Sequence, residues 1–193
     1  MNNNWYNSNY TVWNYKKINK ANLYSAGILP YTFDQNGTCL FLLGKDTNGD
    51  WSDFGGRCEC KDNNEPVFTA SREFYEETLG AVLSIQECLD KINFTKKIIS
   101  KTLNGSPYYM HLMYMDYLPF SDTFQKIQTF IRYTYSQDKR FINKLIEKTA
   151  IRWFTMDTLI NCIENKVTPP ILLRGVFLKT IENNKEQLQF LSK

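Results

Sequence analysis

The feature that most constrains this chain is segment 72–77, Arg-Glu-Phe-Tyr-Glu-Glu, which follows the pair Gly55 and Gly56. At about 100° per residue, a helix through this segment brings its glutamates within an arc of roughly 100° and places an apolar arc beside them. Like charges so close together repel each other, so a cation is needed to offset them. Mg²⁺ prefers carboxylate oxygens together with the phosphates of a substrate. The segment therefore predicts a metal-dependent phosphate site.

Together these residues resemble the Nudix box, the signature G-x5-E-x7-R-E-U-x-E-E-x-G-U in which U is apolar. Gly55, Gly56 and Arg57 match its start, segment 72–77 matches its helical core, and Gly80 matches its end. The surroundings are also similar to those of Nudix domains. Strands are expected before the box, an aromatic-rich strand runs into the glycines, and a strand with a tryptophan precedes a short helix near the C-terminus. The resemblance covers roughly residues 22–180.

The box departs from that signature in its loops. One residue is added in the turn after the helix, and two are added in the loop before it. Counting forward from Gly56 places the first acid of the box at Asp62. Counting back from Arg72 places it at Asn64, with Glu65 next to it. Loops tolerate insertions better than helices, so these additions do not weaken the match of the helical core.

The resemblance implies an α/β fold, an α/β/α sandwich around a mixed sheet. Strands are predicted at 23–33 and 38–43, on either side of an Asn-Gly turn that favours positive φ. The box helix begins near Pro66, which suits the first helical position. The other predicted elements are strands at 97–102 and 108–117 and helices at 124–136, 139–148, 157–164 and 171–191. We interpret the helical segment at about 120–148 as an insertion in the domain.

Composition indicates a single domain at 22–193, because 193 residues can bury one sizeable core. The preceding arm, 1–21, is rich in Asn and aromatic residues, and we expect it to pack on the domain. Five cysteines, an odd number without a pairing framework, indicate reduced thiols and an intracellular, cytoplasmic protein. No apolar run approaches the roughly 20 residues of a membrane span, so no membrane partner is expected. The residue bias is typical of an AT-rich genome, such as that of a protist or a large DNA virus.

In the chemistry that the resemblance implies, Glu73, Glu76 and Glu77 bind Mg²⁺ or Mn²⁺ together with the backbone carbonyl of Gly55. Arg72 holds the glutamates and the loop in place through its fork of N–H donors. The metal ions offset the charge of a diphosphate and position a water, so that a nucleoside diphosphate linked to a group X is cut inside the diphosphate.

The general base is predicted to be Glu76 or Glu147, and Glu147 lies six residues before Trp153. A solvated surface position is the alternative for Glu147. We therefore predict a catalytic set of two box glutamates, the box arginine and this residue. The predicted substrate-binding residues are two cations that reach phosphates and two aromatics that stack on a base, with surface and core roles as the respective alternatives: Arg57, Lys45, Trp51 and Phe54.

The substrate class stays open at this point, because fold similarity does not determine it. The candidates are capped RNA, oxidised or free nucleoside triphosphates, dinucleoside polyphosphates or nucleotide sugars, and diphosphoinositol polyphosphates. For capped RNA, cations of the helical insertion are expected to guide the strand: Lys126, Arg132, Lys139, Arg140 and Lys144. The alternative from another class is a Nudix-fold module that binds a nucleotide without cutting it.

Overall fold

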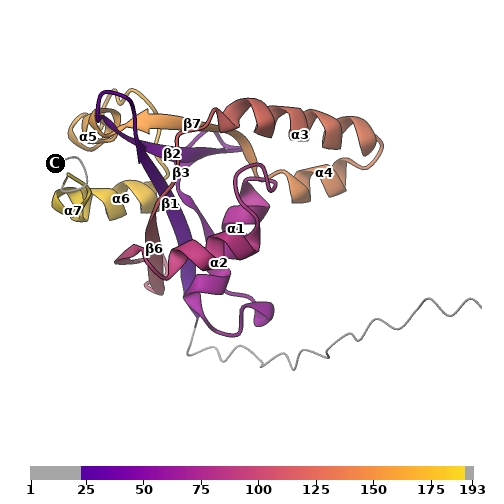
Figure 1. Cartoon of the computed structure of the whole chain (residues 1–193), viewed down its shortest axis with the longest axis horizontal. Helices are drawn as coiled ribbons and strands as arrows, with labels where there is room; N and C mark the ends of the chain where they lie inside the picture. Colours follow the sequence, from indigo (N-terminus) through magenta and orange to yellow (C-terminus); the bar gives the residue numbers. More distant parts are fainter. Residues whose placement is uncertain (1–22, 190–193) are drawn as a thin grey trace, which may run out of the picture.

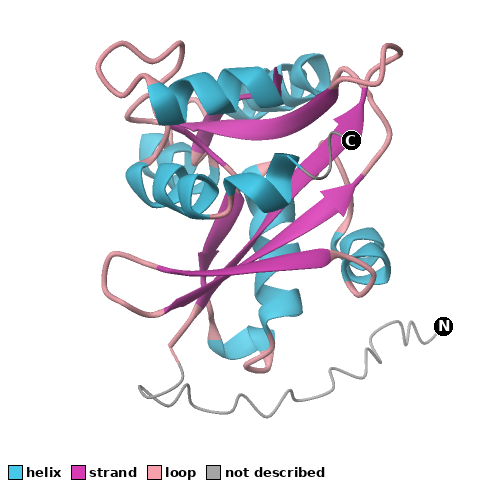
Figure 2. Cartoon of the chain, turned by 90° about the vertical axis from the view of Figure 1, so that its left-hand side faces the viewer, coloured by secondary structure: helices cyan, strands magenta, loops and turns pink. Residues whose placement is uncertain are grey.

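The fold is described from a computed structural model in which residues 23–189 are placed. The predicted arm at 1–21 lies outside the described residues. Between residues 23 and 189, no helix is long and apolar enough to cross a membrane. The strands form a mixed sheet with helices on both sides, as Figures 1 and 2 show. The predicted α/β/α sandwich is confirmed.

The centre of the sheet is strand β1 (Ser25–Phe33), whose first six residues are all buried. It pairs in parallel with β6 (Pro107–Tyr114), which in turn pairs with β5 (Lys96–Lys101). A strand covered on both faces is typically apolar along its whole length, as β1 is. The other edge of β1 is shared, since β2 (Cys39–Asp46) pairs with its end and β4 (Phe54–Arg57) pairs with its start.

Strand β2 extends the sheet beyond β1 by pairing with β3 (Trp51–Ser52) and with β7 (Lys148–Thr155). The turn between β1 and β2 is the predicted one, because the N–H of Gly37 donates to the carbonyl of Asp34 at 3.0 Å and Gly37 has a φ of 78°. Strand β4 contains the two glycines of the box and ends at Arg57. Strands β2 and β4 therefore share one edge of β1, and β4 leads from that edge into the box loop.

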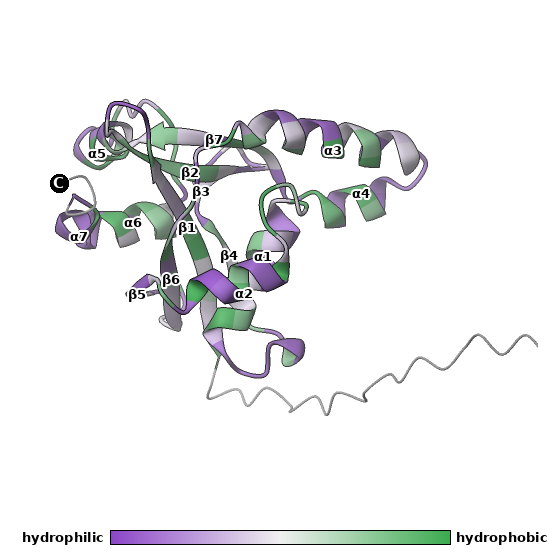
Figure 3. Cartoon of the chain, viewed as in Figure 1, coloured by the Kyte–Doolittle hydropathy of each residue, from purple (hydrophilic) through white to green (hydrophobic). Residues whose placement is uncertain are grey.

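Two apolar cores fill the space between the sheet and its helices. One core joins the sheet to α1 (Pro66–Glu77), α2 (Ile85–Ile92) and α3 (Phe120–Thr134). The other joins it to α5 (Met156–Glu164), α6 (Gly175–Asn183) and α7 (Lys185–Gln189). In Figure 3 the helices are banded in hydrophilic and hydrophobic colours, as expected for helices with one buried side.

The structure differs from the predicted elements in three places. Helix α2 was not predicted, although Ser84 and Glu87 form a capping box at its start. The predicted helix at 171–191 begins only at α6, because the preceding residues are extended and bond to Trp51 through the carbonyl of Leu172. Helix α4 (Lys139–Leu145) ends three residues before the predicted end at 148, and residue 148 opens strand β7 instead.

Candidate active site

Helix α1 is anchored by its apolar side and exposes its acidic side. Pro66 occupies its first turn, where a missing N–H costs nothing. Ala70 and Phe74 are completely buried, and the ring of Phe74 meets that of Phe54 edge to face at 5.2 Å. This contact fixes the helix against β4. The glutamates of segment 72–77 are thereby held beside the two glycines of the box.

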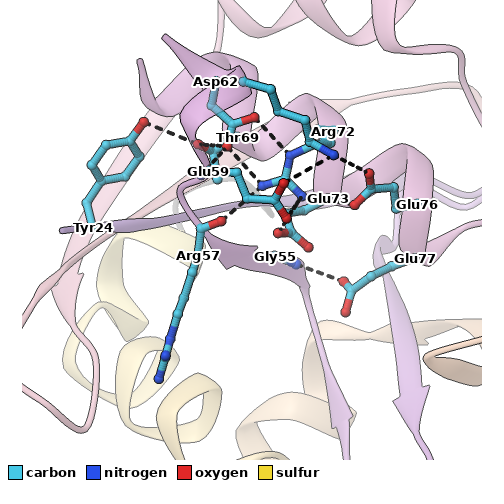
Figure 4. A network of polar contacts seen from close by, with 11 residues as sticks. Tyr24, Gly55, Arg57, Glu59, Asp62, Thr69, Arg72, Glu73, Glu76 and Glu77 are labelled. Carbon is cyan, nitrogen blue, oxygen red and sulfur yellow. Dashed lines mark hydrogen bonds and ion pairs between the residues drawn. The ribbon is translucent and has the colours of Figure 1, made fainter. Parts of the chain in front are cut away.

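Arg72 is the centre of the polar network at this site, drawn in Figure 4. Its side chain is only 6% exposed. Its Nη1 donates to Glu73 Oε1 at 2.8 Å and to Glu76 Oε2 at 2.9 Å, and its Nη2 donates to the carbonyl of Arg57 at 2.9 Å. Its Nε and Nη2 bind the two carboxylate oxygens of Asp62. Arg72 thus connects the loop before the helix to two of the predicted metal ligands.

Asp62 is the loop acid that pairs with Arg72. It is the residue that counting forward from Gly56 gave as the first acid of the box. It also accepts from Thr69 Oγ1 and from the backbone N–H of Glu59, both at 2.8 Å. Burial raises the pKa of Asp62, but the hydrogen bonds from Arg72 outweigh it and the pKa lies below its ordinary value. Asn63 and Asn64 follow in left-handed conformations, with φ of 54° and 60°. The longer loop is accommodated there.

Glu73 fits beside the loop because Gly56 has no side chain. A Cβ at Gly56 would overlap the Glu73 carboxylate. The Glu73 side chain is 13% exposed, and burial raises its pKa. Glu76 is more open, at 47%, and also pairs with Lys61 at 3.2 Å. These two carboxylates therefore differ in their freedom to move, and Glu76 is the one that can turn without disturbing the core.

Glu77 lies one helical turn after Glu73, and a buried lysine holds its carboxylate. Its Oε2 accepts from the N–H of Gly55 at 2.8 Å, and its Oε1 lies 3.3 Å from the Nζ of Lys148. Burial raises the pKa of Glu77 to about 8, and the positive charge of Lys148 opposes that rise. Burial lowers the pKa of Lys148, but the charges of Glu77 and Asp46 outweigh it and the pKa is raised.

The network opens onto a cleft of about 570 Å³. The structure brings seven of the predicted site residues to this cleft: Gly55, Arg57, Arg72, Glu73, Glu76, Glu77 and Glu147. Glu147 is exposed and lies between α4 and β7, so it is not within a helix. The side chain of Arg57 extends away from the Arg72 network, as Figure 4 shows. A second cavity of about 290 Å³ adjoins the cleft and shares Gly55, Gly56 and Arg57 with it.

Three predicted substrate-binding residues lie elsewhere. Phe54 is completely buried between β4 and α1, and Trp51 is 7% exposed in the other core. Neither ring presents a free face for a base, so the stacking prediction for both was wrong. Lys45 does not line the cleft, since its Nζ lies over the Trp51 ring at 5.8 Å. Strand alternation explains the positions of Lys45 and Trp51, which lie opposite each other on the face of the second core. Phe54 faces α1 instead and is covered by Phe74.

Several residues of the site were missed by sequence reasoning. Asp46, at the end of β2, and Lys148, at the start of β7, form an ion pair of 2.6 Å below Glu77. Asn143 and Arg174 line the cleft from α4 and from the residue before α6. None of the four belongs to a short motif. Only the pairing of β2 with β7 brings Asp46 and Lys148 together, and that pairing has no local signal.

The donor set fits a hard divalent cation, because the side chains at the cleft that can ligate a metal offer oxygen, most of it from carboxylates. Within residues 23–189, no three acidic, histidine or cysteine side chains converge closely enough to hold an ion. The reason is visible in the contacts, since Glu73 and Glu76 bond Arg72 while Glu77 bonds Gly55 and Lys148. Binding a metal therefore requires Glu73 and Glu76 to turn away from Arg72, and Glu76 is the most exposed of the three glutamates.

The fold was compared with known proteins. No protein-family model and no curated protein matches the sequence. Among solved structures, the Nudix hydrolase RenU of M. smegmatis is similar with a TM-score of 0.50 and 14% identity, and the match covers 86% of each chain. The C-terminal domain of mouse MUTYH, solved with human PCNA, has a TM-score of 0.49 and 13% identity, and the match covers 86% of this chain and 90% of that one. An Ap4A hydrolase of C. elegans has a TM-score of 0.47 and 12% identity, and the match covers 86% of this chain and 98% of that one.

The likeness to RenU, together with the mixed sheet and the box helix, identifies the architecture. This chain has the Nudix fold. The fold that the box implied is thereby confirmed. At 14% identity the likeness extends to the fold alone, and the chemistry must be argued from the residues of the cleft.

Proposed function

We propose that this protein is a Mg²⁺- or Mn²⁺-dependent pyrophosphohydrolase that cuts the diphosphate of a nucleoside diphosphate linked to a group X. The observation that carries the proposal is the arrangement of Glu73, Glu76 and Glu77 around one cleft, with Arg72 ordering two of them and a glycine loop beside them. The Nudix fold supports it, because in that fold these are the box residues. A solvated amphipathic helix would need neither a buried arginine nor a buried loop acid.

Each residue of the cleft has a distinct task in this proposal. Glu73, Glu76 and Glu77 hold the metal with the carbonyl of Gly55, and Arg72 keeps the carboxylates and the loop in register. When bound, the metal supplies positive charge to the diphosphate and acidity to a water. The side chain of Glu147 is exposed at the cleft and forms no ion pair with another described residue. It is therefore the better placed of the two candidate bases, because Glu76 is bonded to Arg72.

The two adjoining cavities suggest which part of a substrate of this class each of them binds. Besides Arg72, the cleft carries the carboxylates and two further arginines, Arg57 and Arg174, which suits a metal-bound diphosphate. The smaller cavity is lined by Tyr108 and Phe177 and by the buried carboxyl of Asp53, which suits a compact ring with a polar edge. Tyr108 donates to Asp53 in a short hydrogen bond. We therefore place the diphosphate in the cleft and a nucleoside in the smaller cavity.

Within this class we propose capped RNA as the substrate, because the α3 and α4 surface suits a single strand. Lys126, Phe130 and Tyr133 follow one another at helical spacing on the outer side of α3, and the two rings are 66% and 83% exposed. Segment 126–144 has five basic residues and one acidic residue. Exposed aromatics among cations bind bases by stacking and phosphates by charge. Helix α4 reaches the cleft through Asn143, so this surface continues from it.

The second candidate, a binding module that does not cut, is favoured by one observation. The box carboxylates are bonded to Arg72, Lys148 and the loop and do not converge on a common point among the described residues. In that reading the network is structural and the cleft recognises phosphates through its arginines.

A substrate panel tests both candidates. The protein is incubated with Mg²⁺ or Mn²⁺ and with capped RNA, nucleoside triphosphates, dinucleoside polyphosphates, nucleotide sugars and diphosphoinositol polyphosphates, and the products are separated by chromatography. We expect metal-dependent cleavage inside a diphosphate that chelator and Glu76→Gln abolish. Binding of a panel member without cleavage under any metal supports the module. Cleavage of a small nucleotide but not of capped RNA overturns the RNA assignment alone.

A further inference from the structure

Lys148 is the most completely buried cation among residues 23–189, with no exposed surface. It lies behind the wall of the cleft, between two acids that line the cleft. Its Nζ is 2.6 Å from Asp46 Oδ1, 2.9 Å from Ser52 Oγ and 3.3 Å from Glu77 Oε1. Its alkyl chain lies over Gly44, where a Cβ would come within 2.9 Å of the lysine Cδ. The strands are therefore built around this side chain.

The partners of Lys148 determine its charge. Asp46 and Glu77 present carboxylate oxygens, and the hydroxyl of Ser52 already donates its proton to the carbonyl of Asp53 at 2.8 Å. Ser52 therefore accepts from Nζ. Three acceptors around one nitrogen match the three N–H bonds of an ammonium group. A positive charge thus stands between two carboxylates, at the position where a cation from solution would otherwise bind both.

We propose that Lys148 is a built-in counter-ion that takes the place of a metal ion between Glu77 and Asp46, and that it positions Glu77 for the metal centre. This inference rests on the proposed function, since it assumes that a metal ion binds to the box glutamates on the side of Glu77 that faces away from Lys148. Glu77 is held at one oxygen by the ammonium and at the other by the N–H of Gly55. The carboxylate is thereby fixed and neutralised before any metal arrives. The site consequently needs fewer metal ions than its acids alone would hold.

The pairing of β2 with β7 gives Lys148 this position. The register shifts between Lys45 and Asp46, and the shift sets Asp46 opposite Lys148. The one other cation near Asp46 in the described part of the chain is Arg174, whose Nε is 3.7 Å from Oδ2 and whose side chain is 51% exposed. Arg174 approaches from solvent and forms no ion pair with Glu77 among the described residues. Only Lys148 joins the two acids.

Two substitutions separate the charge of Lys148 from its volume. Lys148→Ala vacates the position of Nζ, and the space opens to the cleft because Asp46 and Glu77 both line it. Lys148→Met fills most of that space without charge. Lys166→Ala is the matched control, because it removes the lysine of an exposed ion pair with Glu182, 2.7 Å long, and neither residue lines the cleft.

The measurement is the number of Mn²⁺ ions bound per chain, by electron paramagnetic resonance of free Mn²⁺, with thermal melting in chelator and in saturating Mn²⁺. We expect Lys148→Ala to bind one more ion than the wild type, and Lys148→Met and Lys166→Ala to bind the wild-type number. In chelator both Lys148 variants melt below the wild type. Saturating Mn²⁺ restores most of the loss in Lys148→Ala and little of it in Lys148→Met.

An unchanged Mn²⁺ number in Lys148→Ala, with equal Mn²⁺ shifts in both variants, overturns the inference and leaves the proposed function standing. A wild type that binds no Mn²⁺ overturns the proposed function instead. If Lys148→Ala does not fold in chelator, it is refolded with Mn²⁺ and followed by circular dichroism. Folding that depends on Mn²⁺ supports the inference, whereas failure with Mn²⁺, when Lys148→Met folds, overturns it.

Discussion

Arg72 and Asp62 form a two-point ion pair in which Nε lies 2.9 Å from Oδ1 and Nη2 lies 2.9 Å from Oδ2. Both side chains are buried, at 6% and 2% exposure. Asp62 belongs to a short 3-10 turn (Cys60–Asp62) and Arg72 to α1, so the pair ties the loop to the helix. Arg72 therefore contributes both to the order of the proposed metal ligands and to the stability of the domain.

Replacing Arg72 with Ala should reduce stability and activity together. A buried acid left without its partner costs about 3–5 kcal/mol. Arg72→Lys should recover little, because an ammonium cannot reproduce the two-point contact. Urea denaturation and turnover are measured for both. Arg57→Ala is the control for stability, since Arg72 uses only the backbone carbonyl of Arg57. Loss of turnover with unchanged unfolding would mean that Arg72 acts on the substrate.

Glu76→Gln should lower kcat by at least about a hundredfold, because a metal ligand and its charge are lost where the transition state carries most charge. The melting temperature in chelator should stay near that of the wild type, since the Glu76 side chain is 47% exposed. The control is Glu65→Gln, a residue at the helix start that makes no capping bond. Near wild-type turnover of Glu76→Gln at saturating Mg²⁺ contradicts the metal assignment.

Gly56→Ala should displace the Glu73 carboxylate, because the added Cβ overlaps it. We expect a large loss of kcat, and a Mg²⁺ requirement shifted to higher concentration. The matched substitution is Gly175→Ala, where nothing lies within 4 Å of the new Cβ. Its kinetics should not change. Equal kinetics for the two variants would show that Glu73 has room to move and that the glycine loop does not shape the site.

His111, the single histidine of the chain, should titrate far below its ordinary range. Burial lowers the pKa of His111 to about 4, with Lys97 contributing. Because the unfolded chain binds a proton near pH 6.5 and the native chain does not, stability is lost as pH falls from about 6.5 toward 4, on the order of 3 kcal/mol. Proton NMR of the ring and urea denaturation between pH 4 and 7.5 measure both effects. His111→Gln should flatten the pH profile of stability between pH 6.5 and 4. A wild-type ring that titrates near pH 6.5 contradicts the prediction.

Reversing the charge of Arg132, Lys139 and Arg140 should raise KM for a long capped RNA. Phosphate contacts by exposed cations weaken with salt, so the wild type should show the steeper salt dependence. Turnover of a small dinucleotide should hardly change. Replacing Lys166, Lys179 and Lys185 by Glu gives a control of equal charge on other elements. Equal loss of both activities would place the α3 and α4 surface in the catalytic scaffold.

The sequence predicted the parts of the site that lie close together in the chain. Helical periodicity grouped Glu73 with Glu76, and the glycine pair located the loop beside them. It left the loop acid open because counting in the two directions gave different residues, and only the contact with Arg72 selects Asp62. It also assigned Phe54 to substrate, because an aromatic before a glycine loop has the same pattern whether it faces a cleft or the core.

The parts that the sequence did not predict depend on contacts between distant strands. Lys148 looks like the solvated end of a helix until β7 pairs with β2, which buries it. The residues before α6 have helical spacing, yet they are extended because Trp51 supplies backbone partners for them. Propensity is a weak prior in such places, since tertiary pairing outweighs a few tenths of a kcal/mol per residue.

The separation of Asp46 and Lys148 by 102 positions has a consequence for the order in which the protein matures. A ribosome releases the acidic helix well before it releases the strand that carries the buried cation. Until that strand docks, Glu77 lacks its ion pair with Lys148. The cleft described here therefore cannot be complete before β7 has been made and has paired with β2.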